Sequence, residues 1–308
     1  MSTDLANSAD AHRVVHYEVA LDVVATLAPL QSGPGDPTSA RYDETSWKAL
    51  GTRAGPATVA ARQTGPSEVS FWSWGAGSDV ALANVDGWLG LDDTLEEFDP
   101  SPHPAVERIA LRRRGVRMGR FGLVFERLVP TILGQLVIAA EAKRSYMRLV
   151  ARHGSKAPGP LALRVAPAAA TLSELGSQDF HEFGVERKRA ETIRRAARVG
   201  DRLDACADSE LESAYTLLQS IRGIGPWTAA SVGRVCFGDP DAVIVGDYNL
   251  PHTVGWALAG KRRSTDEEML ELLEPFRPHR GRVQAMLKGG DKAPRRGPKN
   301  PFREIERH

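Results

Sequence analysis

The sequence predicts a mainly α-helical protein whose helical domain follows a small α+β domain with an antiparallel sheet. Short apolar runs separated by Gly- and Pro-rich breakers fill the first third of the chain. Beyond residue 100 apolar residues recur at helical spacing, and the proline-rich stretch FDPSPHP at 98–104 divides the two patterns. The expected parts are a flexible tail at 1–12, the α+β domain at 13–99, the helical domain at 100–288 and a basic, flexible tail at 289–308.

The composition is ordinary for a globular protein. The 308 residues include 42% hydrophobic and 26% charged residues, and the length suits about two domains. No apolar run approaches the ~18 residues of a membrane span, and the N-terminus MSTDLANSADAHR lacks the pattern of a signal peptide. The two cysteines, Cys206 and Cys236, exclude a disulfide framework or a four-cysteine metal site. The histidines lack the spacing of metal ligands, so a metal-dependent hydrolase is not expected. A cytoplasmic location is the simple interpretation of the composition.

The charges are divided unevenly along the chain. Residues 1–100 contain 5 Lys/Arg and 15 Asp/Glu, whereas residues 101–308 contain 35 and 24. This division indicates two modules, of which the second faces a polyanion. Solvated helix faces rich in arginine are an equally good explanation of the charge alone.

The first domain contains short β-like segments. Residues 16–21 partly alternate, 57–63 are short and mixed, and 69–74 carry aromatic side chains. The breakers between segments lie at 32–37, 51–56 and 64–66. Residues 79–89 then predict a helix.

The second domain shows helical periodicity. One apolar face is formed by Phe121, Val124, Phe125 and Leu128. Gly134 interrupts the pattern, and further helices are expected at 138–153, 172–183 and 187–199, with a loop at 153–160. A later apolar stripe consists of Leu211, Ala214, Leu218 and Ile221, and it leads directly into the sequence IRGIGPWTAA at 221–230.

This sequence predicts a tight hairpin between two helices. Gly223 and Gly225 leave room for a ligand to approach the backbone, and Pro226 suits the first turn of the next helix. Free N–H groups at that helix start form a seat for a phosphate. A plain αα-corner with a glycine cap is the simpler alternative. A dinucleotide-binding loop is excluded, because the third glycine is absent and the preceding segment is helical.

Asp247 lies twenty residues after Trp227, within VIVGDYNL at 243–250. With the hairpin, this resembles the helix-hairpin-helix (HhH-GPD) DNA glycosylases, and within them the DNA-3-methyladenine glycosylase 2 group. Supporting matches are ILGQLV at 132–137, GVERKRAETI at 184–193 and PFRPHR at 275–280. The resemblance covers about residues 100–288 and implies a two-part helical glycosylase domain preceded by a small sheet domain.

The resemblance implies a monofunctional DNA glycosylase of base excision repair that acts on alkylated purines flipped out of duplex DNA. Asp247 matches the catalytic aspartate, although an ordinary helix N-cap is an alternative role compatible with catalysis. Bifunctional relatives have a lysine nucleophile where Trp227 stands, so strand cleavage is not expected. Such a protein would be a monomer by default, associated with the nucleoid and not with a membrane.

The resemblance also implies contacts with DNA. Gln135 and Leu136 match the wedge that fills the gap left by the flipped base, although a core leucine at a helix break is the alternative. The predicted phosphate-binding hairpin comprises Arg222, Gly223, Gly225 and Thr228. Further candidates for phosphate contacts are Arg234, Arg277 and Arg280, each of which is otherwise a surface residue. The backbone carbonyls of Gln219, Ile221 and Ile224 would hold Na⁺ or K⁺, and no other cofactor is required.

The base pocket matches less well. Trp227 and Tyr248 are candidate walls for stacking a cationic base, whereas simple core packing is the alternative for Trp227. Ser231 and Lys288 stand at positions where the group has aromatic residues. These departures leave open a damaged-DNA-binding protein with little or no glycosylase activity.

Overall fold

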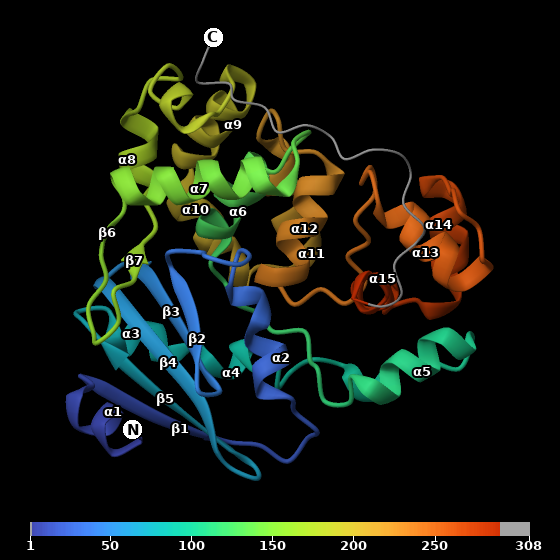
Figure 1. The fold of residues 1–308 in the computed structure, drawn as a ribbon, viewed down its shortest axis with the longest axis horizontal. Helices are drawn as coiled ribbons and strands as arrows, with labels where there is room; N and C mark the ends of the chain where they lie inside the picture. Colours follow the sequence, from blue (N-terminus) through green and yellow to red (C-terminus); the bar gives the residue numbers. More distant parts are fainter. Residues whose placement is uncertain (1, 290–308) are drawn as a thin grey trace.

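A computed structural model describes residues 2–289, and most of the predicted basic tail therefore lies outside the described residues. The described N-terminal part is a five-stranded antiparallel sheet in the order β1-β5-β4-β3-β2 with short helices on it, and helices fill the rest (Figure 1). The strands are β1 Ala11–His16, β2 Ser39–Tyr42, β3 Thr45–Thr52, β4 Gly55–Gly65 and β5 Glu68–Trp74. The short helices are α1 Ser2–Ser8, α2 Val23–Leu27, η1 Ala28–Leu30, α3 Ser78–Ala83 and α4 Val85–Trp88.

Both faces of the sheet are buried. On β5, Val69 and Phe71 pack in a core with α2, α3 and α4, whereas Trp72 and Trp74 point into a second core on the opposite face. A strand buried on both faces has apolar residues at successive positions. This explains why the sequence alternates only partly, although the expected small α+β domain with an antiparallel sheet is confirmed.

The expected flexible tail at 1–12 is wrong for the described residues. Residues 2–8 form α1, and β1 pairs with β5 from Ala11 onward. Leu5 is buried in the same core as Trp74, whose indole N–H donates to Ser8 Oγ across 3.4 Å. This burial stabilises the segment through a contact that is remote in sequence.

Other elements of the first domain also differ from expectation. Strand β1 ends at His16, so residues 17–21 are not a strand, and the hairpin of β2 and β3 was not predicted. The helix expected at 79–89 is divided at Asn84 into α3 and α4.

The helical part begins at Pro104, which occupies the first turn of its first α-helix because a missing N–H is tolerated there. Its elements are α5 Pro104–Arg112, α6 Val124–Leu133, α7 Ala139–His153, α8 Ala169–Glu174, α9 Arg187–Ala197, α10 Gly200–Ala205, α11 Leu211–Ser220, α12 Pro226–Cys236, α13 Leu250–Ala259, α14 Asp266–Leu273 and α15 Arg280–Lys288. The short strand β6 Ser155–Lys156 lies within the loop expected at 153–160, and it pairs with β7 Arg164–Val165 beyond that loop. The helix predicted at 172–183 ends at Glu174, and a single 3₁₀ turn, His181–Phe183, follows.

Two separate cores confirm the two-part helical architecture. One core lies among α6–α12, and the other lies among α5 and α13–α15. Helix α12 serves both, because Val232 and Cys236 belong to the first core while Ala230 and the partly buried Trp227 pack in the second. In Figure 1 α12 lies at the centre, with α7–α9 on one side and α13–α15 on the other. None of the described helices combines the length and apolar character needed to cross a bilayer.

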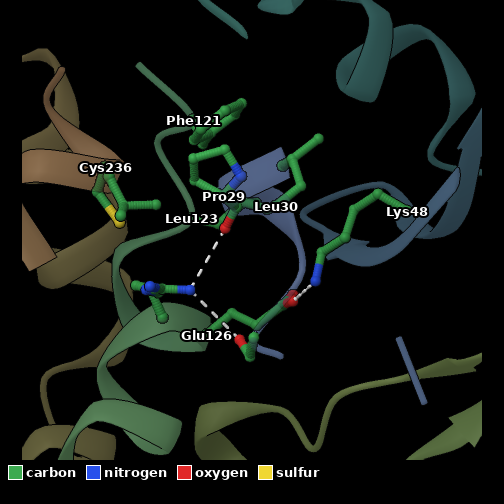
Figure 2. A pocket seen from close by; sticks show the side chains of 10 residues that line it. Pro29, Leu30, Lys48, Phe121, Leu123, Glu126 and Cys236 are labelled. Carbon is green, nitrogen blue, oxygen red and sulfur yellow. Dashed lines mark hydrogen bonds and ion pairs between the residues drawn. The ribbon is translucent and has the colours of Figure 1, made fainter. Parts of the chain in front are cut away.

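Buried ion pairs fasten the sheet to the helices. Lys48 on β3 pairs with Glu126 on α6 beside a cavity of about 20 Å³, room for about one water molecule (Figure 2). Arg282 on α15 pairs with Asp93 after α4, and both side chains are almost fully buried. Breaking a buried pair leaves an uncompensated charge, so these contacts resist separation of the layers.

Candidate active site

The hairpin between α11 and α12 has the predicted form. Gly223 has φ +105°, and a Cβ there would lie 2.2 Å from Oγ1 of Thr192. Ile224 is buried in the core of α6–α12, while Gly225 has open space where a side chain would begin. Pro226 starts α12. The hairpin is thus pinned by its first glycine and left bare at its second, which suits the approach of a backbone phosphate.

Asp247 lies between α12 and α13, where the two helical cores meet. Its Oδ1 accepts the backbone N–H groups of Asn249 (2.8 Å) and Leu250 (2.9 Å). Its Oδ2 accepts the indole N–H of Trp227 across 3.1 Å. The carboxylate is half-buried and oriented by three donors. It accepts the first N–H of α13, but the N-cap of that helix is Asn249, so Asp247 is not an ordinary N-cap.

Side chains from three helices hold the extended segment that precedes Asp247. Gln284 on α15 is fully buried and bonds both the N–H and the carbonyl of Ile244, at 2.9 and 3.0 Å. Asp266 on α14 accepts the N–H of Gly246 at 2.8 Å, and Arg234 on α12 donates to the Ala242 carbonyl at 2.7 Å. Sequence reasoning missed Gln284 and Asp266, although a glutamine among apolar neighbours on α15 was an available signal.

Trp227 connects the carboxylate to the break between α6 and α7. One edge of its indole donates to Asp247, and its Cη2 lies 3.8 Å from the place of a Cβ on Gly134. The ring is half-buried and also packs against the α13–α15 core. Core packing of Trp227 is therefore observed, and the same side chain also bonds the candidate catalytic carboxylate.

The predicted wedge lies in the turn after α6. Leu136 is 89% exposed and has φ +58°, a left-handed conformation that L-residues other than Asn and Asp seldom adopt. Gln135 donates from Nε2 to the Gly223 carbonyl (3.0 Å) and to Thr228 Oγ1 (2.8 Å). The alternative of a core leucine is thereby excluded, and the turn is tied to the hairpin.

Several predicted phosphate contacts need correction. Thr228 is only 2% exposed, and its hydroxyl oxygen accepts from Gln135 Nε2. The side chain is therefore not directed at a DNA phosphate. Burial lowers the pKa of Arg234 to about 10, and its guanidinium serves Ala242 and Gln284. Arg280 binds Asp241 through two nitrogens, at 2.9 and 2.6 Å, which raises its pKa.

Arg277 pairs with Glu274 at 2.8 Å, but both side chains are 54% exposed, so its guanidinium remains at the surface and the predicted phosphate contact stays a prediction. The sequence could not identify these carboxylate partners. Arg222 remains exposed at the hairpin, and Arg195 donates to its carbonyl at 3.3 Å.

The remaining residues considered for the base pocket lie in different places. Tyr248 is 69% exposed next to Asp247, Ser231 bonds the Trp227 carbonyl at 2.7 Å, and Lys288 is exposed at the end of α15. Across residues 2–289 no cluster of His, Cys, Asp and Glu side chains suits a metal ion. Gln219 lies in the last turn of α11 and Ile221 is its C-cap. Carbonyl groups at the end of a helix lack intrahelical hydrogen-bond partners.

No family model matches the chain. The DNA-3-methyladenine glycosylase of Bacillus subtilis (strain 168) is 26% identical over 200 residues, which cover 63% of this chain and 66% of that protein. The DNA-3-methyladenine glycosylase 2 of Escherichia coli (strain K12) is 30% identical over 146 residues, which cover 47% of this chain and 52% of that protein. The matches therefore span just under two thirds and about half of these relatives.

Solved structures show the same fold over more of the chain. The 3-methyladenine DNA-glycosylase from Archaeoglobus fulgidus superposes with a TM-score of 0.76 at 19% identity, over 89% of this chain and 96% of that one. The Clostridium acetobutylicum 8-oxoguanine glycosylase/lyase, solved with duplex DNA, has a TM-score of 0.67 at 15% identity, over 91% and 96%. Sequence relatives and fold neighbours thus converge: the chain is similar in sequence to two DNA-3-methyladenine glycosylases, and it shares the fold of solved DNA glycosylases.

Proposed function

We propose that the protein is a monofunctional DNA glycosylase that removes alkylated purines from duplex DNA in base excision repair. One observation supports this most strongly. A carboxylate, a phosphate-seating hairpin and a protruding leucine are joined by hydrogen bonds, from Asp247 to Trp227 and from Gln135 to Gly223. These are parts that hydrolysis of a flipped nucleotide needs.

In the proposed reaction, water attacks C1′ of the flipped deoxyribose while the bond from C1′ to the base nitrogen breaks. The bonding pair leaves with the base, so a cationic alkylated purine departs neutral and needs no proton from the protein. Positive charge develops on the sugar as the bond lengthens, and the Asp247 carboxylate stabilises it. The water loses one proton to the bulk solvent as its oxygen bonds to C1′, and the products are a neutral free base and an abasic site.

Trp227 makes the enzyme monofunctional. An indole cannot form the Schiff base through which a lysine at this position starts strand cleavage. The fold alone does not decide this, because a glycosylase/lyase has it too. Here the indole N–H is directed at Asp247, so the residue orients the carboxylate instead of attacking the sugar.

The hairpin and the wedge would contact different parts of the DNA: the hairpin its phosphate backbone, and the wedge its base stack. The free N–H groups at the start of α12 receive a phosphate beside the lesion, and the bare Gly225 lets the strand approach. Leu136 fills the gap that the flipped base leaves, which offsets part of the unstacking cost. The exposed faces of Trp227 and Tyr248 would stack on the cationic base. The protein would do so as a monomer on nucleoid DNA in the cytoplasm.

A monovalent cation would complete the hairpin. Carbonyl oxygens of Gln219, Ile221 and Ile224 are suitable donors for Na⁺ or K⁺, and the Ile221 oxygen keeps a lone pair after accepting the Ile224 N–H at 2.9 Å. Replacing both ions with a bulky organic cation at constant ionic strength should weaken binding to an abasic duplex. Unchanged affinity would remove this part of the proposal.

The function is tested with duplexes that each carry one lesion, including N3- and N7-alkylated purines, 8-oxoguanine and uracil. We expect release of alkylated purines, with abasic sites left intact until alkali is added. Borohydride should not trap the protein on the substrate, because no imine forms. Binding of an abasic-analogue duplex without release of any base would instead support a damaged-DNA-binding protein, which the positions Ser231 and Lys288 suggest.

A further inference from the structure

Arg189 on α9 is a buried cation next to the wedge and has no role in the reaction above. Its side chain is 3% exposed. Its Nη1 donates to the carbonyl of Leu133 across 2.7 Å, and its Nε lies 3.4 Å from Glu186. Burying a guanidinium is costly unless the fold supplies partners, so these contacts fix where the side chain lies.

The acceptor is the last residue of α6. Carbonyls in the final turn of a helix have no intrahelical partner, and Leu133 immediately precedes the turn that carries Leu136. Arg189 therefore caps the helix from which the wedge projects.

The same guanidinium acts on the other end of the turn. Glu141, in the first turn of α7, is 8% exposed. Burial lowers the pKa of Arg189, and the negative charges of Glu186 and Glu141 act against that lowering. Arg189 is thus bonded to the end of α6, and the charge of Glu141 on α7, the next helix, also acts on it.

Such support is needed because Leu136 is strained. A left-handed conformation is unfavourable for an L-residue such as leucine, and the exposed side chain has almost no packing to offset this. Strained residues persist where their surroundings determine the backbone. Here Arg189 bonds the carbonyl at the start of the turn, and Gln135, next to Leu136, donates to the Gly223 carbonyl.

We propose that Arg189 is a positioning residue that holds the wedge turn so that Leu136 protrudes before DNA arrives. This rests on the proposed function and adds to it a means by which wedge insertion is prepared in the free protein. Without Arg189 the turn relaxes, and Leu136 enters the duplex less often, whereas the hairpin still grips phosphate.

The test separates insertion from gripping. A duplex with 2-aminopurine opposite a tetrahydrofuran abasic analogue reports insertion as a rise in fluorescence when the opposing base unstacks. We compare wild type, Arg189→Met, Arg189→Lys and Leu136→Ala, with Arg187→Met as control because Arg187 is an exposed cation on the same helix. Affinity for undamaged duplex is measured alongside, since it depends on the hairpin and not on the wedge.

Arg189→Met should lose most of the fluorescence rise, as Leu136→Ala does, while its affinity for undamaged duplex matches that of Arg187→Met. Its excision from duplex should fall about tenfold, and excision of the same lesion from a single strand should stay within about twofold, because no gap needs filling there. Arg189→Lys keeps the charge without the planar fork and should be intermediate.

A folded Arg189→Met protein with a wild-type fluorescence rise would overturn the inference. If Arg189→Met gives no cooperative thermal transition, Arg189→Lys decides in the same way. A wild-type protein that neither binds the abasic duplex nor excises any lesion would instead remove the proposed function, so the two failures are distinguishable.

Discussion

The indole N–H of Trp227 donates to Oδ2 of Asp247 across 3.1 Å and thereby links the hairpin helix α12 to the start of α13. The other carboxylate oxygen accepts two backbone N–H groups. Three donors thus set the direction of one half-buried carboxylate at the junction of two cores. The chemistry proposed for the protein depends on that direction, and it can be tested one donor at a time.

Trp227→Phe should keep the packing of the ring and remove its donor. A hydrogen bond to a charged group contributes about 1.5–3 kcal/mol, so excision should fall about tenfold to a hundredfold. Binding to an abasic-analogue duplex should change little. Single-turnover excision and equilibrium binding together check this, and an unchanged excision rate would mean that the bond does not orient the carboxylate.

Leu136→Gly should separate stability from activity. Glycine adopts φ +58° without strain, and the 89% exposed leucine has almost no burial to lose. The free energy of unfolding should therefore stay the same or rise by up to about 1 kcal/mol, while duplex excision falls. Leu111, 71% exposed within α5, is the matched control: Leu111→Gly should cost about 1 kcal/mol and leave excision intact. Chemical denaturation measures the free energy of unfolding of the two variants.

The two hairpin glycines should respond differently to alanine. At Gly223 a Cβ would meet Thr192, which is itself buried and bonded to the Lys188 carbonyl, and φ is +105°. Gly223→Ala should lose about 2 kcal/mol or more of folding free energy. Gly225→Ala meets open space and should remain stable, yet weaken DNA binding, because the methyl group stands where a strand approaches. Normal DNA affinity in Gly225→Ala would contradict the proposed clamp.

The free energy of unfolding should decrease on mild acidification, because the unfolded chain protonates His279 more readily than the folded protein does. Burial and the charge of Arg282 lower the pKa of His279 below its usual 6.5, and its Nδ1 accepts from Arg282 Nε at 3.3 Å. The unfolded chain therefore takes up this proton first. The neutral imidazole contributes stability above pH 6.5, and that contribution is lost as the pH falls through the lowered value. Melting temperatures at pH 7.5 and 5.5 should differ less in His279→Asn than in wild type; an equal difference would exclude this histidine.

The local form of the hairpin could be predicted because the residue types along the chain determine it. Gly223, Gly225 and Pro226 specify a helical hairpin through backbone freedom and a tolerated missing N–H. Asp247 was identified through the resemblance to helix-hairpin-helix glycosylases, and in the structure it accepts the indole N–H of Trp227. Leu136 protrudes as the resemblance implied.

The supporting contacts could not be predicted, because they join residues that are distant in sequence. Nothing local indicates that Gln284 bonds Ile244, or that Arg189 reaches Leu133. For the same reason Arg280 looked like a phosphate contact until Asp241 was seen beside it. The N-terminal residues 2–12 looked like a tail because the core that receives Leu5 is built by strands further along the chain.

The most direct test of the central claim is excision of an alkylated purine from duplex DNA by wild type and Asp247→Asn. The amide keeps an oxygen for the backbone N–H groups but cannot stabilise developing positive charge as a carboxylate does. We predict a loss of about a hundredfold or more in the single-turnover rate, with binding to an abasic-analogue duplex preserved. Asp266→Asn, the same exchange at the residue that holds Gly246, should lose far less. Equal rates for wild type and Asp247→Asn would contradict the account.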